Sequence, residues 1–274
     1  MDNITIIKPK KTFDLIGDLK EIWIFKDLFY FLTWRDLKVR YKQTMVGVAW
    51  AIFKPFMSMV VFTIFFGNFA KMPSDGIPYP IFVYVGLLLW QFFSSSLSQA
   101  SSSLISNTSI FTKVYFPRLM LPISSILTNF VDFFIATVIL IGLMVYYNYL
   151  PNLIGVLILP ILLIITFMAS MGLGLFLSAV NVKYRDVRYI LPFFIQTLMF
   201  LTPVIYPTSI TGKYSKFLAL NPMTGVIKAA RAAILGNAPI NWLLLLISGT
   251  ASLILLIFGI IYFKKTEKYF ADIV

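Results

Sequence analysis

Apolar residues fall into long runs along the chain, and short polar stretches separate these runs. A helix needs about 20 apolar residues to cross a bilayer core of about 30 Å. Six runs meet or approach that length, so we predict six membrane-spanning helices, of which the fifth is only just long enough. The predicted spans cover residues 46–69, 80–103, 119–147, 153–180, 190–206 and 242–263.

The stretch between the fifth and sixth spans, residues 207–239, follows a different pattern. It mixes Pro, Gly and Asn with two short helical patterns, around Tyr214–Ala219 and Thr224–Leu235. Neither pattern is long or apolar enough to span, so we predict re-entrant or interfacial helices here. The predicted fold class is therefore an all-α membrane protein.

The stretch Phe29–Pro55 changes from polar to apolar at Gly47. Its first half places aromatic side chains on one stripe at helical spacing and cations mostly on other faces. This pattern favours a helix on the membrane surface, with aromatics among the headgroups and cations towards anionic lipid. An ordinary basic flank that sets topology is the alternative. The residues that define this interface helix are Tyr30, Trp34, Arg35, Lys38, Arg40 and Tyr41.

The composition excludes a soluble protein. Hydrophobic residues make up 59% of the chain and charged residues 12%, and the mean hydropathy is +0.87. So few charges could not cover a soluble surface. The net charge of +12 lies beside the apolar runs, which is typical of juxtamembrane segments and gives no reason to expect nucleic-acid binding.

Cations follow the second and fourth predicted spans, and both ends of the chain are basic. The positive-inside rule therefore places both termini in the cytosol. We divide the chain into a cytosolic N-terminus with the interface helix (1–45), a six-span domain (46–263) and a cytosolic tail (264–274). Four cations oppose the rule and suggest a separate role: Lys213, Lys216, Lys228 and Arg231.

Residues that carry chemistry are scarce. The chain has no Cys and no His, which excludes disulfides, thiol catalysis and the commonest metal ligands. It has no GxxxxGK[ST] loop, so this chain hydrolyses no nucleotide itself. Asp132 is the only acid within a predicted span, and it is most simply an interhelical hydrogen-bonding partner. We predict no catalytic residue, no metal and no cofactor in this chain.

Three features leave two interpretations open. Serine recurs every fourth residue from Ser94 to Ser106, which suits either helix packing or a hydroxyl-lined conduit, and small residues from Ser170 to Ser178 predict a packing face. Lys54 lies in the first turns of a span and either snorkels to the interface or faces a pore mouth. Aromatic side chains within the spans either face acyl chains or line a pore that stacks on sugar rings.

Five motifs occur in a characteristic order. They are RDLKVRYKQTMVGVAWAIFKPF at Arg35–Phe56, KVYFPRLMLP at Lys113–Pro122, NVKYRDV at Asn181–Val187, TPVIYP at Thr202–Pro207 and LNPMTGVI at Leu220–Ile227. Together they resemble the transmembrane permease subunit of type 2 ABC exporters for cell-surface polysaccharides, the class that carries O-antigen, capsule and teichoic acid. The similarity covers nearly the whole chain.

This resemblance implies a homodimer in the cytoplasmic (inner) membrane, bound to two copies of a separate ATPase subunit that uses ATP and magnesium. It also implies a channel for a lipid-linked polysaccharide. Cargoes of the same superfamily, such as a drug, a peptide or another lipid, are one alternative. A membrane-embedded lipid-processing enzyme is another, and the lack of His, Cys and clustered acids counts against it.

The resemblance also assigns roles to residues. The coupling segment to the ATPase comprises Ser109, Ile110, Phe111, Thr112, Lys113, Val114, Tyr115, Phe116, Pro117 and Arg118. The channel or its lateral gate comprises Trp50, Phe53, Lys54, Phe193, Phe194 and Phe200. The cytosolic gate loop comprises Asn181, Lys183, Tyr184, Arg185, Asp186 and Arg188. The outer gate comprises Tyr206, Asn221, Pro222, Lys228 and Arg231, whose cations would meet lipid headgroups, lipid phosphates or an anionic polymer.

Overall fold

The computed structural model describes residues 15–42, 47–149, 153–236, 238–268 and 270, and all regular structure in these ranges is helical. The helices are α1 (Leu15–Ile24), α2 (Lys26–Lys42), α3 (Ala49–Phe62), the π-helix η1 (Thr63–Phe69), α4 (Tyr79–Ser106), α5 (Thr108–Phe111), α6 (Met120–Tyr146), α7 (Leu153–Lys183), α8 (Val187–Leu201), the 3₁₀-helix η2 (Thr208–Tyr214), α9 (Ser215–Leu218), α10 (Pro222–Leu235) and α11 (Trp242–Glu267). The predicted cytosolic residues 1–14, 43–45 and 271–274, and residue 46 at the start of the first predicted span, lie outside the described residues.

Five of the described helical stretches are long and apolar enough to cross a membrane: α3 with η1, α4 with α5, α6, α7 and α11. The predicted fifth span instead corresponds to α8, which has 15 residues and ends at Leu201. Thr202 is extended because the following Pro203 disfavours the helical conformation of the residue before it. At 1.5 Å per residue α8 is about 22 Å long, less than a bilayer core. The six-span count therefore stays a prediction.

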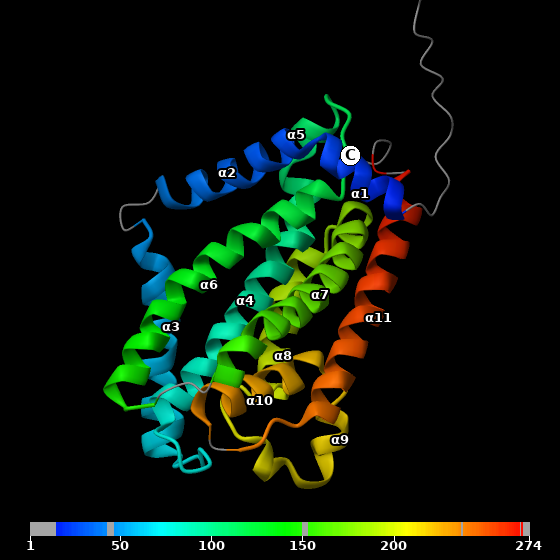
Figure 1. Ribbon diagram of the computed structural model, residues 1–274. Coiled ribbons are helices and arrows are strands. Elements are labelled where there is room, and N and C mark those ends of the chain that lie inside the picture. The colour runs from blue at the N-terminus through cyan, green and yellow to red at the C-terminus, as the bar shows by residue number, and fades with distance from the viewer. Residues whose placement is uncertain (1–14, 43–46, 150–152, 237, 269, 271–274) are drawn as a thin grey trace, which may run out of the picture.

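The direction of the helices nevertheless requires a return passage. Figure 1 shows that α7 and α11 both run towards the same end of the bundle, where α1 also lies. The chain between Lys183 and Trp242 must therefore travel back to the opposite end. It does so through α8 and the segment that follows it.

The two ends of the bundle differ in character. At one end α1, α2, α5 and the last turns of α11 lie together, and at the other end α9 and α10 lie near the start of α11 (Figure 1). This grouping agrees with the predicted clustering of the basic connectors. Which end faces the cytosol stays a prediction.

Helix α4 forms the centre of the bundle and packs against α3, α6, α7 and α10. In its most apolar stretch 78% of the residues are buried, a larger share than in the other four candidate spans. The Tyr84 hydroxyl donates a hydrogen bond of 2.8 Å to the Ala136 carbonyl oxygen and so ties α4 to α6.

The predicted packing face of the fourth span is confirmed. Ser170 and Ser178 on α7 are fully buried, and Gly174 lies so close to α4 that an added Cβ would be 2.6 Å from the Cβ of Ala100. Small residues allow this close approach of two helices in a membrane.

The serine repeat of α4 does not pack within the subunit. Ser98, Ser102 and Ser106 are exposed, whereas Ser101 and Ser103, on another face, are buried. The packing interpretation of this repeat is therefore wrong for the single chain, because α4 turns a different set of serines inwards. The conduit interpretation stays a prediction.

Helix α10 matches the second short pattern predicted between spans five and six. The side chain of Asn221 caps it by accepting a 3.0 Å hydrogen bond from the Met223 amide, and Gly236 ends it in the left-handed conformation. Apart from the half-buried Lys228, all its residues are buried. Its depth in a membrane stays a prediction.

Candidate functional site

Arg40 joins the interface helix α2 to the core of the bundle. The Arg40 guanidinium forms an ion pair with Asp132 on α6 and donates a 3.1 Å hydrogen bond to Asn129 Oδ1. It also donates hydrogen bonds to Gln99 on α4 and to Thr128 Oγ1, the latter at 2.9 Å. We call Arg40, Gln99, Thr128, Asn129 and Asp132 the Arg40 junction. It fastens α2 to two different helices.

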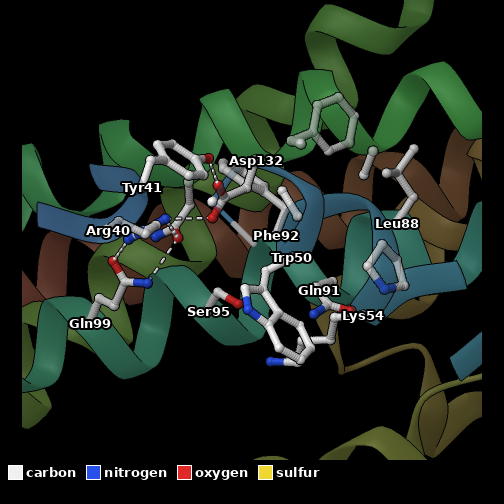
Figure 2. A pocket seen from close by; sticks show the side chains of 16 residues that line it. Arg40, Tyr41, Trp50, Lys54, Leu88, Gln91, Phe92, Ser95, Gln99 and Asp132 are labelled. Atoms are coloured by element: carbon white, nitrogen blue, oxygen red, sulfur yellow. Dashed lines mark hydrogen bonds and ion pairs between the residues drawn. The ribbon is translucent and has the colours of Figure 1, made fainter. Parts of the chain in front are cut away.

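Tyr41 adds a second contact to the same carboxylate. Its hydroxyl donates a hydrogen bond to Asp132 Oδ1. Burial, followed by the hydrogen bond to Asp132, raises the pKa of Tyr41, so the phenol stays protonated and remains a donor. Figure 2 shows Tyr41 and Arg40 converging on Asp132, with Gln99 on the other side of the Arg40 guanidinium.

The junction confirms one prediction and corrects another. Asp132 is an interhelical hydrogen-bonding partner, as predicted. Arg40 was expected to point towards anionic lipid, but it points inwards, because a carboxylate inside an apolar helix needs a cation. Arg35 is likewise occupied by protein, since its guanidinium donates to Asn107 Oδ1 at 2.6 Å and to Asp36 Oδ1 at 2.7 Å.

The remaining members of the interface helix keep an outward orientation. Lys38 is exposed, and Tyr30 and Trp34 are exposed and stack with their ring centroids 6.4 Å apart. Leu32 is fully buried. The helix therefore has an outer aromatic face and an inner face that packs on α6.

A pocket of about 230 Å³ opens beside the Arg40 junction, between α2, α3, α4 and α6 (Figure 2). Its lining residues are Arg40, Tyr41, Gly47, Trp50, Ala51, Lys54, Pro55, Leu88, Gln91, Phe92, Ser95, Gln99, Asn129, Asp132, Phe133 and Ala136. Two predicted gate residues, Trp50 and Lys54, are among them.

The other predicted gate residues do not line this pocket. Phe53 on α3 and Phe193, Phe194 and Phe200 on α8 have exposed side chains. Only Val187 and Leu191 of α8 are buried. The predicted gate residues thus fall into two groups. Trp50 and Lys54 line a pocket within the subunit, and the four phenylalanines are exposed on α3 and α8.

The predicted coupling segment divides into an exposed part and an internal part. Consecutive side chains from Thr112 to Tyr115 are exposed, and Phe116 and Pro117 are buried. The Tyr115 hydroxyl donates a 3.1 Å hydrogen bond to Glu21 Oε1 on α1. The side chains from Thr112 to Tyr115 are therefore accessible to a partner. Ser109 and Ile110, in α5, line a second, more open pocket beside α2, and the side chain of Phe111 lies outside the described residues.

Arg118, the last residue of the predicted coupling segment, makes a contact within the chain. Its guanidinium donates a hydrogen bond to the Glu267 carbonyl oxygen and lies 5.8 Å from the Phe270 ring centroid. It therefore binds the end of α11 in its own chain. The predicted part of Arg118 in coupling to the ATPase stays a prediction.

The predicted cytosolic gate loop is exposed except at its first residue. Asn181 is buried and donates a 3.0 Å hydrogen bond to the Ser101 carbonyl oxygen, which ties α7 to α4. The Lys183 ammonium lies 5.1 Å from the Tyr184 ring centroid. The exposed side chains of this loop are Lys183, Tyr184, Arg185, Asp186 and Arg188.

The predicted outer gate contains a buried arginine. Arg231 donates hydrogen bonds to the carbonyl oxygens of Pro203 at 2.8 Å, Val204 at 2.5 Å and Phe82 at 3.2 Å. It also lies 3.6 Å from the Phe82 ring centroid and 3.4 Å from the Tyr206 carbonyl oxygen. We call these four carbonyl groups the Arg231 cage.

The prediction that Arg231 meets lipid headgroups, lipid phosphates or an anionic polymer is therefore wrong, because its guanidinium is buried among carbonyl groups of its own chain. The reason is that the chain leaves the helical conformation after α8, and its carbonyl groups need donors. Asn221 closes the same region by donating a 2.7 Å hydrogen bond to Thr202 Oγ1. Lys228 is half-buried, and the side chains of Lys213 and Lys216 lie outside the described residues.

Sequence reasoning missed Gln99, Thr128 and Asn129 as partners of Arg40. One signal was present, because Asn129 and Asp132 are three residues apart and share a face of an apolar helix. Two polar side chains on one face of a span indicate a polar partner. The spacing of these two residues does not identify the partner.

The sequence profile of the ABC-2 type transporter family matches residues 27–235. The chain belongs to this family. It is 31% identical over 80% of its length to the O-antigen export system permease protein RfbA of Myxococcus xanthus, and the match covers 84% of that relative. A protein of the same name from Klebsiella pneumoniae is 28% identical over 90% of this chain and 95% of its own length. The polysialic acid transport protein KpsM of Escherichia coli is 24% identical over 85% of this chain and 91% of its own.

The family match spans both the Arg40 junction and the Arg231 cage. It begins within α2 and ends with the last residue of α10. The interface helix and the region between α8 and α10 are thus parts of the shared domain.

Proposed function

We propose that this chain is the channel-forming permease subunit of an exporter that moves polysaccharide across the cytoplasmic membrane. The observation that carries the proposal is the similarity, over most of the chain, to permeases named for O-antigen export and polysialic acid transport. Five long apolar helices supply the membrane domain. The relatives are transport permeases, which favours a transporter over the membrane-embedded enzyme.

The energy source in this proposal is a separate ABC ATPase, present in two copies and using ATP and magnesium. Two features of the chain support it. The sequence has no phosphate-binding loop of its own, and the residues from Thr112 to Tyr115 are exposed at the end of the bundle where α1 and α2 lie. A cytosolic ATPase would contact this segment, with both termini of the permease on the same side.

The channel in this proposal forms between two copies of the chain. Helix α8 is uncovered along most of its length and too short to form a span alone. A second copy would cover its exposed Phe193 and Phe194 or leave them at an opening to lipid. The cargo would be a polysaccharide linked to a lipid, which needs such an opening.

Movement of the coupling segment would reach the channel through α2. Asn107, two residues before the coupling segment, accepts a hydrogen bond from Arg35, and Arg40 is fixed to α4 and α6. The chain then continues into α3. A closed ATPase must contact the coupling segment differently from an open one, because only a difference in contact shifts the equilibrium.

The test is complementation of a strain from which the gene for this chain is deleted. We expect surface polysaccharide to disappear on deletion and to return with the wild-type gene. Lys113→Glu should abolish recovery while the protein remains in the membrane, since Lys113 is exposed in the coupling segment. Lys71→Glu, in the exposed turn after η1, is the matched control and should restore export. Full export by Lys113→Glu would refute the coupling assignment, and unchanged surface polysaccharide after deletion would refute the function.

A further inference from the structure

The pocket beside the Arg40 junction is polar at one end and apolar at the other. Arg40, Gln99 and Asn129 lie at its polar end, and Phe133 and Ala136 continue along α6 to the apolar end. Figure 2 shows Leu88 at the opposite end of the pocket from Arg40 and Gln99. A pocket with this gradient suits an amphiphile better than a free sugar or an apolar drug.

One face of α4 supplies the gradient. Leu88, Gln91, Phe92, Ser95 and Gln99 line the pocket at helical spacing. Leu88 and Gln99 are eleven positions apart, which is about 16 Å along the helix axis. That length accommodates a lipid headgroup together with the first part of its chain.

The charges of the pocket leave one positive group uncompensated. Arg40, Lys54 and Asp132 are its charged lining residues, and Arg40 is paired with Asp132. The sum is one positive charge, which belongs to Lys54. Within the described part of the chain, Lys54 makes no ion pair with its ammonium group. A cation in an apolar helix is costly unless it meets water or an anion.

Lys54 lies near the start of α3, close to the end of the interface helix α2. It lies in the second turn of α3, and Trp50 lies one turn earlier on the same face of the helix. Both line the pocket beside the end of the interface helix α2. If α2 lies on the membrane surface as predicted, this indole and this ammonium group lie where such groups are typical neighbours of lipid phosphates.

We infer that this pocket binds the phosphate headgroup of a membrane lipid. Lys54 contacts the phosphate, the neutral side chains of Gln91 and Ser95 donate hydrogen bonds to the headgroup, and Leu88 and Phe133 contact the start of the chain. Two lipids share this chemistry, a polyprenyl phosphate carrier and an ordinary anionic phospholipid. The identification of the ligand as the carrier of the exported polymer rests on the proposed function, whereas the headgroup site does not.

The experiment measures lipid binding by the full chain in phosphatidylcholine nanodiscs. Labelled undecaprenyl phosphate is the probe, and phosphatidylglycerol, undecaprenol without phosphate and inorganic phosphate are the competitors. We expect undecaprenyl phosphate to bind and undecaprenol not to compete, because the phosphate supplies the charge that Lys54 recognises. Competition by phosphatidylglycerol as strong as that by unlabelled carrier identifies a resident phospholipid, and much weaker competition identifies the carrier.

Four variants separate the site from general attraction to anionic lipid. Lys54→Gln should weaken binding about tenfold, the equivalent of one charge-assisted contact, and Lys54→Arg should retain it. Ser95→Phe should block the pocket without changing its charge. Lys42→Gln, which removes an exposed cation outside the pocket, should bind as the wild type does. Size-exclusion profiles establish that each variant is folded.

Unchanged affinity in both Lys54→Gln and Ser95→Phe would overturn the inference, as would equal competition by undecaprenol. Equal weakening by Lys42→Gln would also overturn it, since the attraction would then be nonspecific. Each of these results leaves the complementation test of the proposed function intact. Loss of binding in Lys54→Gln together with normal export would retain the headgroup site and remove its link to the cargo.

Discussion

Arg40 and Arg231 are both predicted from the sequence to face lipid, but both side chains point into the protein. They are held there in different ways. Arg40 is held by side chains of α4 and α6, including one carboxylate, and 24% of its side chain is exposed. Arg231 is held by backbone carbonyl groups of two distant segments and is 6% exposed. Side chains can exchange partners when a helix moves, whereas backbone carbonyls move only with the chain. The comparison indicates an adjustable attachment at the end where α2 lies and a rigid one at the other end.

The largest effect should come from removing the rigid attachment. Arg231→Met leaves the carbonyl groups of the cage without a donor and should lower the stability of the folded state by on the order of 4 kcal/mol. Thermal unfolding of the purified protein measures this loss. Lys228→Met, on the same helix and half-buried, is the control and should be nearly neutral. Equal stability of the two variants would mean that the cage is not rigid.

A smaller effect should come from breaking the adjustable attachment. Asp132→Leu leaves Arg40 without its anion and should cost about 2 kcal/mol, less than for a fully buried pair because both side chains are partly exposed. The double variant Arg40→Met with Asp132→Leu should be more stable than the single one, because no unpaired charge remains. A double variant that loses the sum of both single effects would show that the two residues do not interact.

The packing around the rigid attachment can be tested without touching the arginine. An added Cβ at Gly86 would lie 2.8 Å from Arg231 Nη2 and 3.0 Å from the Val204 carbonyl oxygen, so Gly86→Ala should cost about 1–2 kcal/mol. Gly142→Ala provides the control, since nothing lies within 4 Å of its added Cβ. Thermal unfolding would contradict the cage geometry if the two alanine variants were equally stable.

The smallest effect should come from the phenol that supports Asp132. Tyr41→Phe removes one hydrogen bond to the carboxylate and should cost about 1 kcal/mol. Tyr30→Phe, on the exposed face of the same helix, should leave the unfolding temperature unchanged. A Tyr41→Phe protein as stable as the wild type would show that the ion pair alone positions Asp132.

Much of the helical plan was predictable from the sequence, because runs of apolar residues determine where a chain can cross lipid. The predicted span 242–263 begins at the first residue of α11, and the predicted range 119–147 differs from α6 by one residue at each end. The partner role of Asp132 was also predictable, since an acid inside an apolar helix needs a donor.

The direction of individual side chains was not predictable, because it depends on residues distant in the sequence. Arg231 turns inwards to meet a carbonyl group that is 149 positions away, at Phe82. The same holds for Ser101 and Ser103, which face inwards although the more regular serine repeat suggested another face. Pro203 ends α8 at Leu201 by a local rule, whereas the apolar run that predicted the fifth span continues to residue 206.

The central claim is that this chain conducts a polysaccharide when an ATPase acts on it, and transport in proteoliposomes tests it most directly. The permease and the ATPase that co-purifies with it are reconstituted with labelled lipid-linked polysaccharide on the side where ATP is added. We predict that the label reaches the opposite side only with ATP and magnesium, and that Lys113→Glu prevents it. The claim would be contradicted if the labelled polysaccharide crossed without ATP. It would also be contradicted if no label crossed when permease, ATPase, ATP and magnesium were all present.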